Sequence, residues 1–181
     1  MPDSQSRFLS LLAQPGRVLV LTLGVMLLSV STGAHLSPPT ITEDHMRLIN
    51  DRALAVATIW QEARGLNYQG KLNVASAIRN RMAAKYSSDG TVPGTVLRAL
   101  QFSGWNAKDP NRFPSVNIDD SNPVVTECAK AWDESEHNDS VNGAVLYYAK
   151  SMGNAPDWAL PSNSKIVAQD NGHIFLVPKA L

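Results

Sequence analysis

The sequence predicts an α+β domain that is mostly helical and carries a small antiparallel β-sheet near its C-terminus. Apolar side chains recur at helical spacing in residues 48–60, 74–82 and 124–132, which favours three amphipathic or buried helices. Residues 144–149 and 173–177 are short runs rich in β-branched and aromatic side chains, which favours strands. With 181 residues, the chain has room for one globular domain of ordinary size.

The N-terminal region has the composition of a targeting segment. Arg7 and Arg17 precede an apolar run at residues 18–30, which gives way to small and polar residues. The run has the length of a signal peptide, and cleavage after Ala34 fits the pattern. An uncleaved anchor fits as well, because extension of the run to Leu36 approaches the roughly twenty residues that span a bilayer. We therefore expect a signal peptide or membrane anchor at residues 1–36, a linker at 37–45 and the domain at 46–181.

The first two helices of the domain are expected to pack closely. Residues 42–44 resemble a helix start, and the strongly apolar helix that follows, as far as Trp60, should be central. A second helix begins near Gly70, and the alanines beside its apolar stripe at residues 74–82 permit close contact with the first helix. A loop at residues 87–90 ends this unit.

The remaining elements follow from turn and cap signals. After Pro93, a short helical stretch reaches Leu100 and leads into residues 101–106, whose polar and aromatic groups suit one wall of a cleft. The pair Asn122-Pro123 supplies an N-cap and a proline at the first helical position, which predicts another helix. The pair Asn142-Gly143 is a turn signal before the first β-prone run.

Composition argues against several classes of function. The formal net charge is zero, so nucleic acid is not an expected partner. The one cysteine, Cys128, lies in an apolar helical pattern, where it acts as a small core residue and cannot form an internal disulfide. The four histidines are scattered without the spacing of a zinc site, and we expect neither a catalytic metal nor a cofactor.

Glu62 is the candidate catalytic residue. It lies near the C-terminal end of the first helix, which we expect to stop at Gly65 as its C′ residue. The negative end of the helix dipole and the apolar residues around Glu62 both raise the pKa of its carboxyl group. A carboxylic acid that stays protonated near neutral pH can give a proton to a leaving group, as cleavage of a glycosidic bond requires. The alternative is a solvated helix residue beside Arg64, the ordinary environment of a glutamate.

A set of motifs resembles, in order and spacing, the catalytic domain of the SleB-type cell-wall hydrolases, which are known from spore cortex-lytic enzymes and phage lysins. The resemblance covers roughly residues 53–176. It rests on Glu62-Ala63-Arg64-Gly65, Gly70 before an alanine-rich helix that ends Asn80-Arg81, Gln101-Phe102-Ser103 with Trp105-Asn106, Tyr147-Tyr148, Pro156-Asp157-Trp158-Ala159, and Gly172-His173 with Phe175.

This resemblance implies a lysozyme-like fold and a lytic transglycosylase that cleaves peptidoglycan glycan strands between N-acetylmuramic acid and N-acetylglucosamine. Glu62 would be its single catalytic residue, and the products would end in 1,6-anhydro-N-acetylmuramic acid. Sugar-binding groups are expected at Gln101, Ser103, Trp105, Asn106, Tyr147, Tyr148 and Trp158. For these aromatic residues the alternative is core packing, and for the polar residues it is solvation or turn capping. We expect an exported monomer, released into the periplasm or held at the inner membrane by its leader.

The chain departs from the family pattern in a few places. Leu146 and Ala149 stand where the family has histidine before the tyrosine pair and asparagine after it, which affects substrate positioning. Gly104 replaces a cysteine or proline, and Leu176 replaces an aromatic residue. The chain also has no room for a separate peptidoglycan-binding domain, which favours a phage lysin.

Other functions fit parts of the sequence. The same fold could serve as a noncatalytic peptidoglycan-binding or virion structural module. A muramidase would need a second carboxylate, for which Asp119, Asp120 and Asp170 are available. A serine or cysteine amidase lacks support, because no Gly-x-Ser-x-Gly elbow is present and Cys128 sits in a packing pattern.

Overall fold

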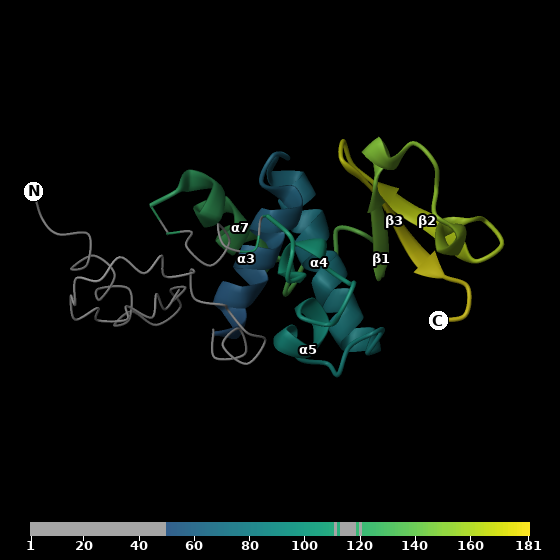
Figure 1. The fold of residues 1–181 in the computed structure, drawn as a ribbon, viewed down its shortest axis with the longest axis horizontal. Coiled ribbons are helices and arrows are strands. Elements are labelled where there is room, and N and C mark those ends of the chain that lie inside the picture. Colours follow the sequence, from purple (N-terminus) through teal and green to yellow (C-terminus); the bar gives the residue numbers. More distant parts are fainter. Residues whose placement is uncertain (1–49, 111, 113–118, 120) are drawn as a thin grey trace, which may run out of the picture.

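Helix α3 (Asp51–Ala63) packs against both α4 (Tyr68–Ala84) and α7 (Pro123–Glu134), which also contact each other (Figure 1). Every residue from Ala53 to Ile59 is buried. A helix that is apolar on all sides belongs in a core, and the predicted central position is confirmed.

The computed structural model describes residues 50–110, 112, 119 and 121–181. The expected leader at residues 1–36, the linker at 37–45 and the helix start at 42–44 lie outside these ranges. Within the described ranges, no helix is both long enough and apolar enough to cross a membrane.

Caps define both ends of α3, at Asn50 and Arg64. The helix begins at Asp51, because Asn50 has an extended ψ of 137° and its side chain accepts a hydrogen bond from the Arg52 backbone N–H. At the other end the helix stops at Ala63, and the C-cap is Arg64 with right-handed helical angles. Gly65 follows this cap without the positive φ of a left-handed C′ residue. The helix therefore ends where expected, but not through the conformation that glycine favours.

Helix α4 begins at Tyr68 instead of Gly70, because the Asn67 side chain accepts the Gly70 backbone N–H at 3.0 Å and caps the helix. Its small buried residues Ala75 and Ala77 allow the predicted close packing.

Helix α5 (Val92–Val96) is shorter than predicted. The helix ends well before Leu100, which has a left-handed φ of 64° and is 84% exposed. A residue with this backbone conformation cannot continue a right-handed helix.

The predicted start of α7 is confirmed. The Asn122 side chain accepts the Val124 backbone N–H at 2.9 Å, and Pro123 occupies the first helical position. Replacing Asn122 by alanine is expected to lower the free energy of unfolding by about 1 kcal/mol, because one helix N–H loses its partner. Urea denaturation measures this change. A conservative Asn122→Ser variant, which keeps a capping oxygen, should retain most of the stability, and equal losses in both variants would contradict the capping role.

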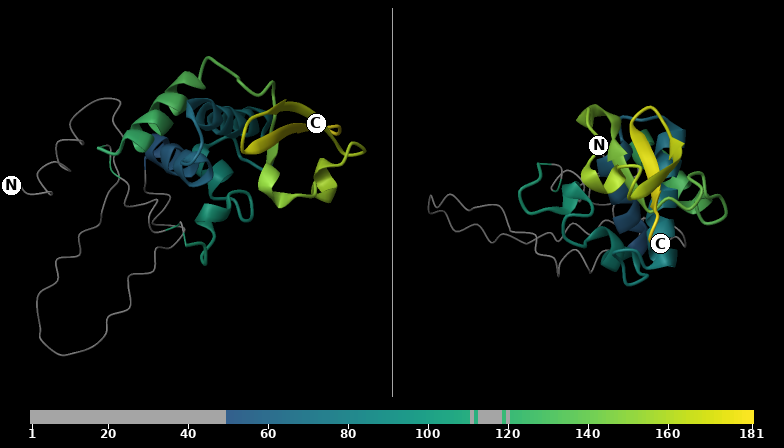
Figure 2. Two further views of the ribbon diagram at one scale, coloured as in Figure 1. Left: turned by 90° about the horizontal axis from the view of Figure 1, so that it is seen from above. Right: turned by 90° about the vertical axis from the view of Figure 1, so that its right-hand side faces the viewer.

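Three strands form the C-terminal sheet: β1 (Leu146–Ala149), β2 (Ser164–Gln169) and β3 (His173–Pro178). The order is β1-β3-β2 and both pairings are antiparallel, so the predicted α+β class with a small sheet is confirmed. Strand β2 was not predicted, because its apolar run is only three residues long, Ile166-Val167-Ala168, and half of its residues are exposed. The sheet lies at one end of the helical layer (Figures 1 and 2). Three short 3-10 helices complete the described part: η1 (Ser103–Trp105), η2 (Lys150–Met152) and η3 (Asp157–Ala159).

Leu66 connects the loop after α3 to the sheet. Its side chain lies against two glycines, Gly70 in α4 and Gly172 in the turn between β2 and β3. A Cβ atom at either glycine would come within 3 Å of this leucine side chain. The close approach places the end of α3 beside the start of β3.

Candidate active site

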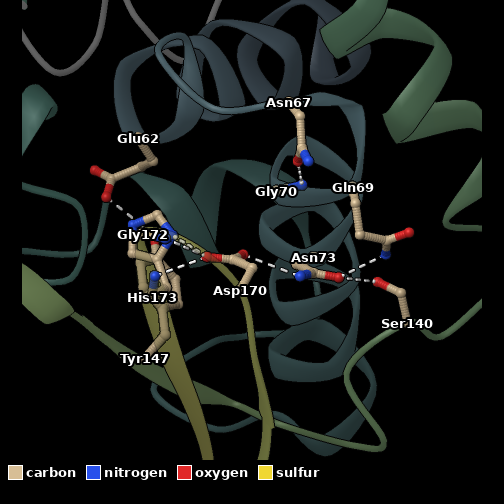
Figure 3. A network of polar contacts seen from close by, with 10 residues as sticks. All are labelled: Glu62, Asn67, Gln69, Gly70, Asn73, Ser140, Tyr147, Asp170, Gly172 and His173. Carbon is tan, nitrogen blue, oxygen red and sulfur yellow. Dashed lines mark hydrogen bonds and ion pairs between the residues drawn. The ribbon is translucent and has the colours of Figure 1, made fainter.

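Glu62 lies in the last turn of α3, on the side that faces the sheet. The Tyr147 hydroxyl, from β1, donates a hydrogen bond to Glu62 Oε2 at 3.0 Å (Figure 3). Both side chains are partly buried. The helical layer and the sheet thus each contribute one polar group to the same point.

Burial raises the pKa of Glu62, the direction expected from the sequence. The Tyr147 hydrogen bond and the positive charges of Arg81 and Arg64 lower the pKa, while the negative charge of Asp109 raises it. Loss of hydration is the largest of these effects. Burial also raises the pKa of Tyr147 well above its ordinary value, so the phenol keeps its proton and remains a donor.

Removing the Tyr147 hydroxyl tests this electrostatic balance. The hydrogen bond stabilises the ionised form of Glu62, so Tyr147→Phe is expected to raise the pKa of Glu62 further. Any activity that needs protonated Glu62 should then extend to higher pH. The pH dependence of the rate measures the shift, and Tyr148→Phe serves as the control because its side chain points to the opposite face of β1. A basic limb that stays in place in Tyr147→Phe would contradict the prediction.

Arg81 is a buried cation in this site and is 4% exposed. Its Nε donates to the Val145 carbonyl at 2.5 Å, and its Nη1 donates to Gln101 Oε1 at 3.0 Å. The guanidinium carbon also lies 5.0 Å from the ring centroid of Phe102. Burial lowers the pKa of Arg81, but an arginine keeps its charge at neutral pH. Arg81 therefore joins α4, the segment after α5 and the entry to β1 around one positive charge.

The predicted cleft wall at residues 101–106 does lie against the end of α3. The Gln61 side-chain amide donates to the Gly104 carbonyl at 3.3 Å. A Cβ atom at Gly104 would lie 2.2 Å from Gln61 Oε1, so the glycine permits this contact. Ser103 is exposed, and Asn106 is half-buried as the residue that ends η1. Of the predicted polar residues, Gln101 already uses its amide oxygen to accept from Arg81.

The structure corrects the expectation for Trp105, which lies in the hydrophobic core and is 7% exposed. Its indole N–H donates to Thr58 Oγ1 at 2.9 Å, one turn before Glu62 in α3. The ring packs in the core beside the active-site helix and is almost fully shielded from solvent. The core alternative for this residue is therefore the correct one.

Tyr148 and Trp158 are not brought together with Glu62. Successive side chains of a strand point to opposite faces, so Tyr148 faces away from Tyr147. Its ring meets the Trp158 ring edge-on, at 6.0 Å between centroids, and Trp158 is 40% exposed. These two aromatic residues form a separate pair on the other face of the sheet.

His173, the first residue of β3, lies beside Tyr147 with 5.1 Å between ring centroids and is 6% exposed. Its Nδ1 is 3.8 Å from Asp170 Oδ1. Burial lowers the pKa of His173, so the imidazole is neutral at neutral pH.

The carboxylates considered for a hydrolytic reaction occupy different environments. Asp170 accepts the backbone N–H groups of Gly172 and His173 and the Asn73 side-chain amide, so it closes the turn between β2 and β3. Asp119 is exposed and contacts Ser121. Asp120 lies outside the described residues. Asp109, which the sequence analysis did not single out, is the aspartate whose charge acts on Glu62.

Cys128 is buried in the core, and burial raises its pKa to about 12. A thiol of this kind is not a nucleophile at neutral pH, which argues against a cysteine amidase. The described residues contain no cluster of three or more His, Cys, Asp or Glu side chains that could hold a metal ion.

Two residues of the site, Arg81 and His173, appeared in the sequence only as family markers. Arg81 continues the apolar stripe of Val74 and Ile78 at helical spacing, and a charged residue on such a stripe indicates a buried, partnered cation. His173 alternates with Phe175 on one face of a strand, which indicates an inward-facing polar group. Both patterns can be recognised in the amino-acid sequence alone.

Comparisons with known proteins agree with this architecture. A family model described as Cell Wall Hydrolase matches residues 65–176, more than half of the chain, and begins just after Glu62. No curated protein sequence matches the chain significantly.

Two solved structures share the fold. The catalytic domain of the germination-specific lytic transglycosylase SleB from Bacillus anthracis has a TM-score of 0.55 and 20% sequence identity, and the match covers 70% of this chain and 93% of that one. The catalytic domain of the Bacillus cereus SleB protein has the same TM-score and identity, with 70% of this chain and 89% of that one covered.

Proposed function

Because the chain belongs to the cell wall hydrolase family, we propose that it cleaves the β-1,4 glycosidic bond between N-acetylmuramic acid and N-acetylglucosamine as a lytic transglycosylase. The observation that carries the proposal is Glu62, an enclosed carboxyl group whose pKa is raised by burial and which the Tyr147 hydroxyl holds in place. The SleB catalytic domain, which has the same fold, is described as a lytic transglycosylase.

In the first step, protonated Glu62 gives its proton to the glycosidic oxygen. The bond between this oxygen and C1 of N-acetylmuramic acid breaks, and the N-acetylglucosamine end leaves as an alcohol. Positive charge develops at C1 while Glu62 becomes a carboxylate. A raised pKa suits this step, because the acid must hold its proton at the working pH.

In the second step, the 6-hydroxyl of the same muramic acid attacks C1 and closes the 1,6-anhydro ring. The hydroxyl proton goes to the Glu62 carboxylate, which restores the acid for the next cycle. Tyr147 and Arg81 stabilise the carboxylate between the two steps, through a hydrogen bond and a positive charge respectively. One glutamate can therefore act as both acid and base.

We place the sugar contacts on the side of the site that carries residues 101–106. Ser103 and Asn106 lie on the segment that packs against the end of α3, and their polar groups can hydrogen-bond to hydroxyl or N-acetyl groups. The Tyr147 ring lies against Phe102 of the same segment, at 6.4 Å between ring centroids. Tyr148 and Trp158 could contact only a sugar that reaches the opposite face of the sheet.

Product analysis tests the proposal. The full chain is incubated with purified peptidoglycan, in parallel with Glu62→Gln, and the soluble fragments are identified by mass spectrometry. We expect fragments that end in 1,6-anhydro-N-acetylmuramic acid from the wild type alone.

Other products would change the assignment. Reducing-end N-acetylmuramic acid would indicate a muramidase, with water as the nucleophile and a second carboxylate, for which Asp109 is then the first candidate. Binding of peptidoglycan without release of fragments would indicate a noncatalytic module.

Action on peptidoglycan places the enzyme outside the cytoplasm. We propose that the segment at residues 1–36 exports the chain, either releasing it into the periplasm or anchoring it in the inner membrane. We also propose that it acts in bacterial lysis as a monomeric phage lysin. Detection of the leader in protein recovered from membrane and soluble fractions distinguishes the two locations.

A further inference from the structure

The buried imidazole of His173 is a polar group that has no role in the proposed mechanism. The imidazole is 6% exposed and meets the rings of Tyr147 and Phe175 edge-on, at 5.1 and 5.8 Å between centroids. Its Nδ1 is buried and lacks a partner within hydrogen-bond distance. Such a buried polar group costs free energy, so it requires an explanation.

Asp170 determines which ring nitrogen of His173 carries the proton. Asp170 Oδ1, held by the backbone N–H groups of Gly172 and His173, lies 3.8 Å from Nδ1. An N–H at Nδ1 is attracted by this oxygen, whereas a lone pair there would be repelled. This attraction favours the neutral tautomer with its proton on Nδ1, which leaves a lone pair at Nε2.

A network of side chains holds Asp170 in place. Asn73 Nδ2 donates to Asp170 Oδ2 at 2.9 Å, and Asn73 Oδ1 accepts from Gln69 and Ser140 (Figure 3). The orientation of His173 is thus fixed by α4 and by the loop before β1. Polar groups oriented by such networks lose little entropy when they bind a ligand.

His173 and Glu62 share Tyr147 as a neighbour. The tyrosine ring contacts the imidazole, and its hydroxyl contacts Glu62 Oε2. No described residue hydrogen-bonds to His173 Nε2, and this atom is not among the buried side-chain atoms that lack a partner. His173 Nε2 therefore has no hydrogen-bond partner among the described residues and keeps a small exposed surface near the candidate catalytic acid.

We propose that His173 is a substrate-contacting residue whose Nε2 accepts a hydrogen bond from a hydroxyl or N-acetyl N–H of the sugar bound at Glu62. The inference rests on the proposed function and adds a residue to its site. Asp170 is the positioning residue that sets the tautomer of His173.

This role predicts a specific dependence on pH. Protonation of His173 removes the acceptor and adds a positive charge beside the Tyr147 ring, so binding weakens at acidic pH. Asp170 is the negative charge that faces the ring and favours this protonation. Because burial lowers the pKa of His173, activity falls only below the ordinary range of histidine. An enzyme that depends on Glu62 alone needs only the protonated acid and keeps its activity there.

The test compares the full-length wild type with His173→Phe and His173→Gln in the release of fragments from purified peptidoglycan between pH 4 and pH 8. His173→Phe keeps the ring contacts and removes both nitrogens. We expect a loss of activity of about tenfold or more at neutral pH in His173→Phe, with no acidic limb in its profile. His173→Gln keeps an amide oxygen that can accept a hydrogen bond, so it should recover part of the rate, also without the acidic limb.

Circular dichroism at each pH confirms that the variants are folded. A His173→Phe variant within twofold of the wild type would overturn the proposal, as would a wild type without an acidic limb. If His173→Phe does not fold, the profile of His173→Gln decides: loss of the acidic limb supports the proposal, and its retention overturns it.

A second measurement does not depend on catalysis. The ¹⁵N chemical shifts of the imidazole in the Glu62→Gln chain report the tautomer, and purified glycan fragments of peptidoglycan are added as the probe. We expect a protonated Nδ1, and a shift of Nε2 when the fragments bind. A protonated Nε2 or an unchanged shift on binding would overturn the inference, whereas a wild type that cleaves nothing would overturn only the proposed function.

Discussion

Glu62→Gln is expected to reduce the release of peptidoglycan fragments by about a thousandfold or more. Loss of a general acid alone explains a thousandfold decrease, and the decrease is larger if the same residue also serves as the base. The amide cannot give a proton to the glycosidic oxygen. It retains the size of the carboxylic acid and can still accept the Tyr147 hydrogen bond, so the site should keep its shape. The initial rate of fragment release measures the change.

The stability of the same variant provides the control. A carboxyl group whose pKa is raised in the folded state contributes stability that is complete below its unfolded pKa and is lost as the pH rises through its folded pKa. Glutamine has no such loss, so at pH 8 Glu62→Gln should be at least as stable as the wild type. An active Glu62→Gln variant would remove this residue from the mechanism. An inactive variant with a lowered melting temperature at pH 8 would mean that the site had been disrupted.

Arg81→Met is expected to lower the free energy of unfolding by about 2–4 kcal/mol, the largest effect on stability that we predict. The substitution keeps much of the apolar volume but leaves the Val145 carbonyl and the Gln101 amide oxygen without their donor. It also removes a positive charge that lowers the pKa of Glu62. Urea denaturation measures the stability, and the pH profile of any remaining activity should extend to higher pH.

Arg79→Met is the matched control on the same helix. Arg79 is only partly buried, and it donates to Ser135 and to the Trp132 carbonyl, away from Glu62. Its loss should cost less stability and leave the pH profile unchanged. Equal effects in both variants would contradict the special position of Arg81. Arg81→Lys keeps the charge but cannot donate from the two positions that Nε and Nη1 occupy. Its free energy of unfolding should therefore lie between those of the wild type and Arg81→Met.

The elements that the sequence predicted well are those with strong local signals. The Asn122 cap specifies α7 through its own side chain, and the apolar surface of α3 leaves the core as the only favourable location. Strand β2 carries a weaker signal, an apolar run of only three residues at Ile166-Val167-Ala168, and its pairing with β3 is made by backbone groups that every sequence possesses.

Predictions for the site depended on what each side chain meets in space. The position of Glu62 at the end of a helix is a local property, and burial raises its pKa as expected. Trp105 could not be assigned locally, because a tryptophan in a polar segment suits both a cleft and a core. Its location was decided by Thr58, forty-seven residues earlier, which accepts the indole N–H. Successive side chains of a strand point to opposite faces, so Tyr147 and Tyr148 are expected on different faces of β1, but the sequence does not indicate which of them contacts Glu62.

Because Tyr147 and Tyr148 are adjacent and identical, the register of β1 against β3 determines which of them lies beside Glu62. A slip of one residue against β3 would turn every side chain of the strand to the opposite face and would offer Tyr148 to Glu62 in place of Tyr147. Because both residues are tyrosine, the phenol itself gives little preference for either alignment.

The contacts at Val145 distinguish the two alignments. Its N–H donates to the Leu176 carbonyl at 3.2 Å, and its carbonyl accepts from Arg81. These bonds hold the residue just before the strand at one position relative to both β3 and α4. The buried arginine thus helps to fix the register of β1, and the register determines which of the two tyrosines becomes part of the active site.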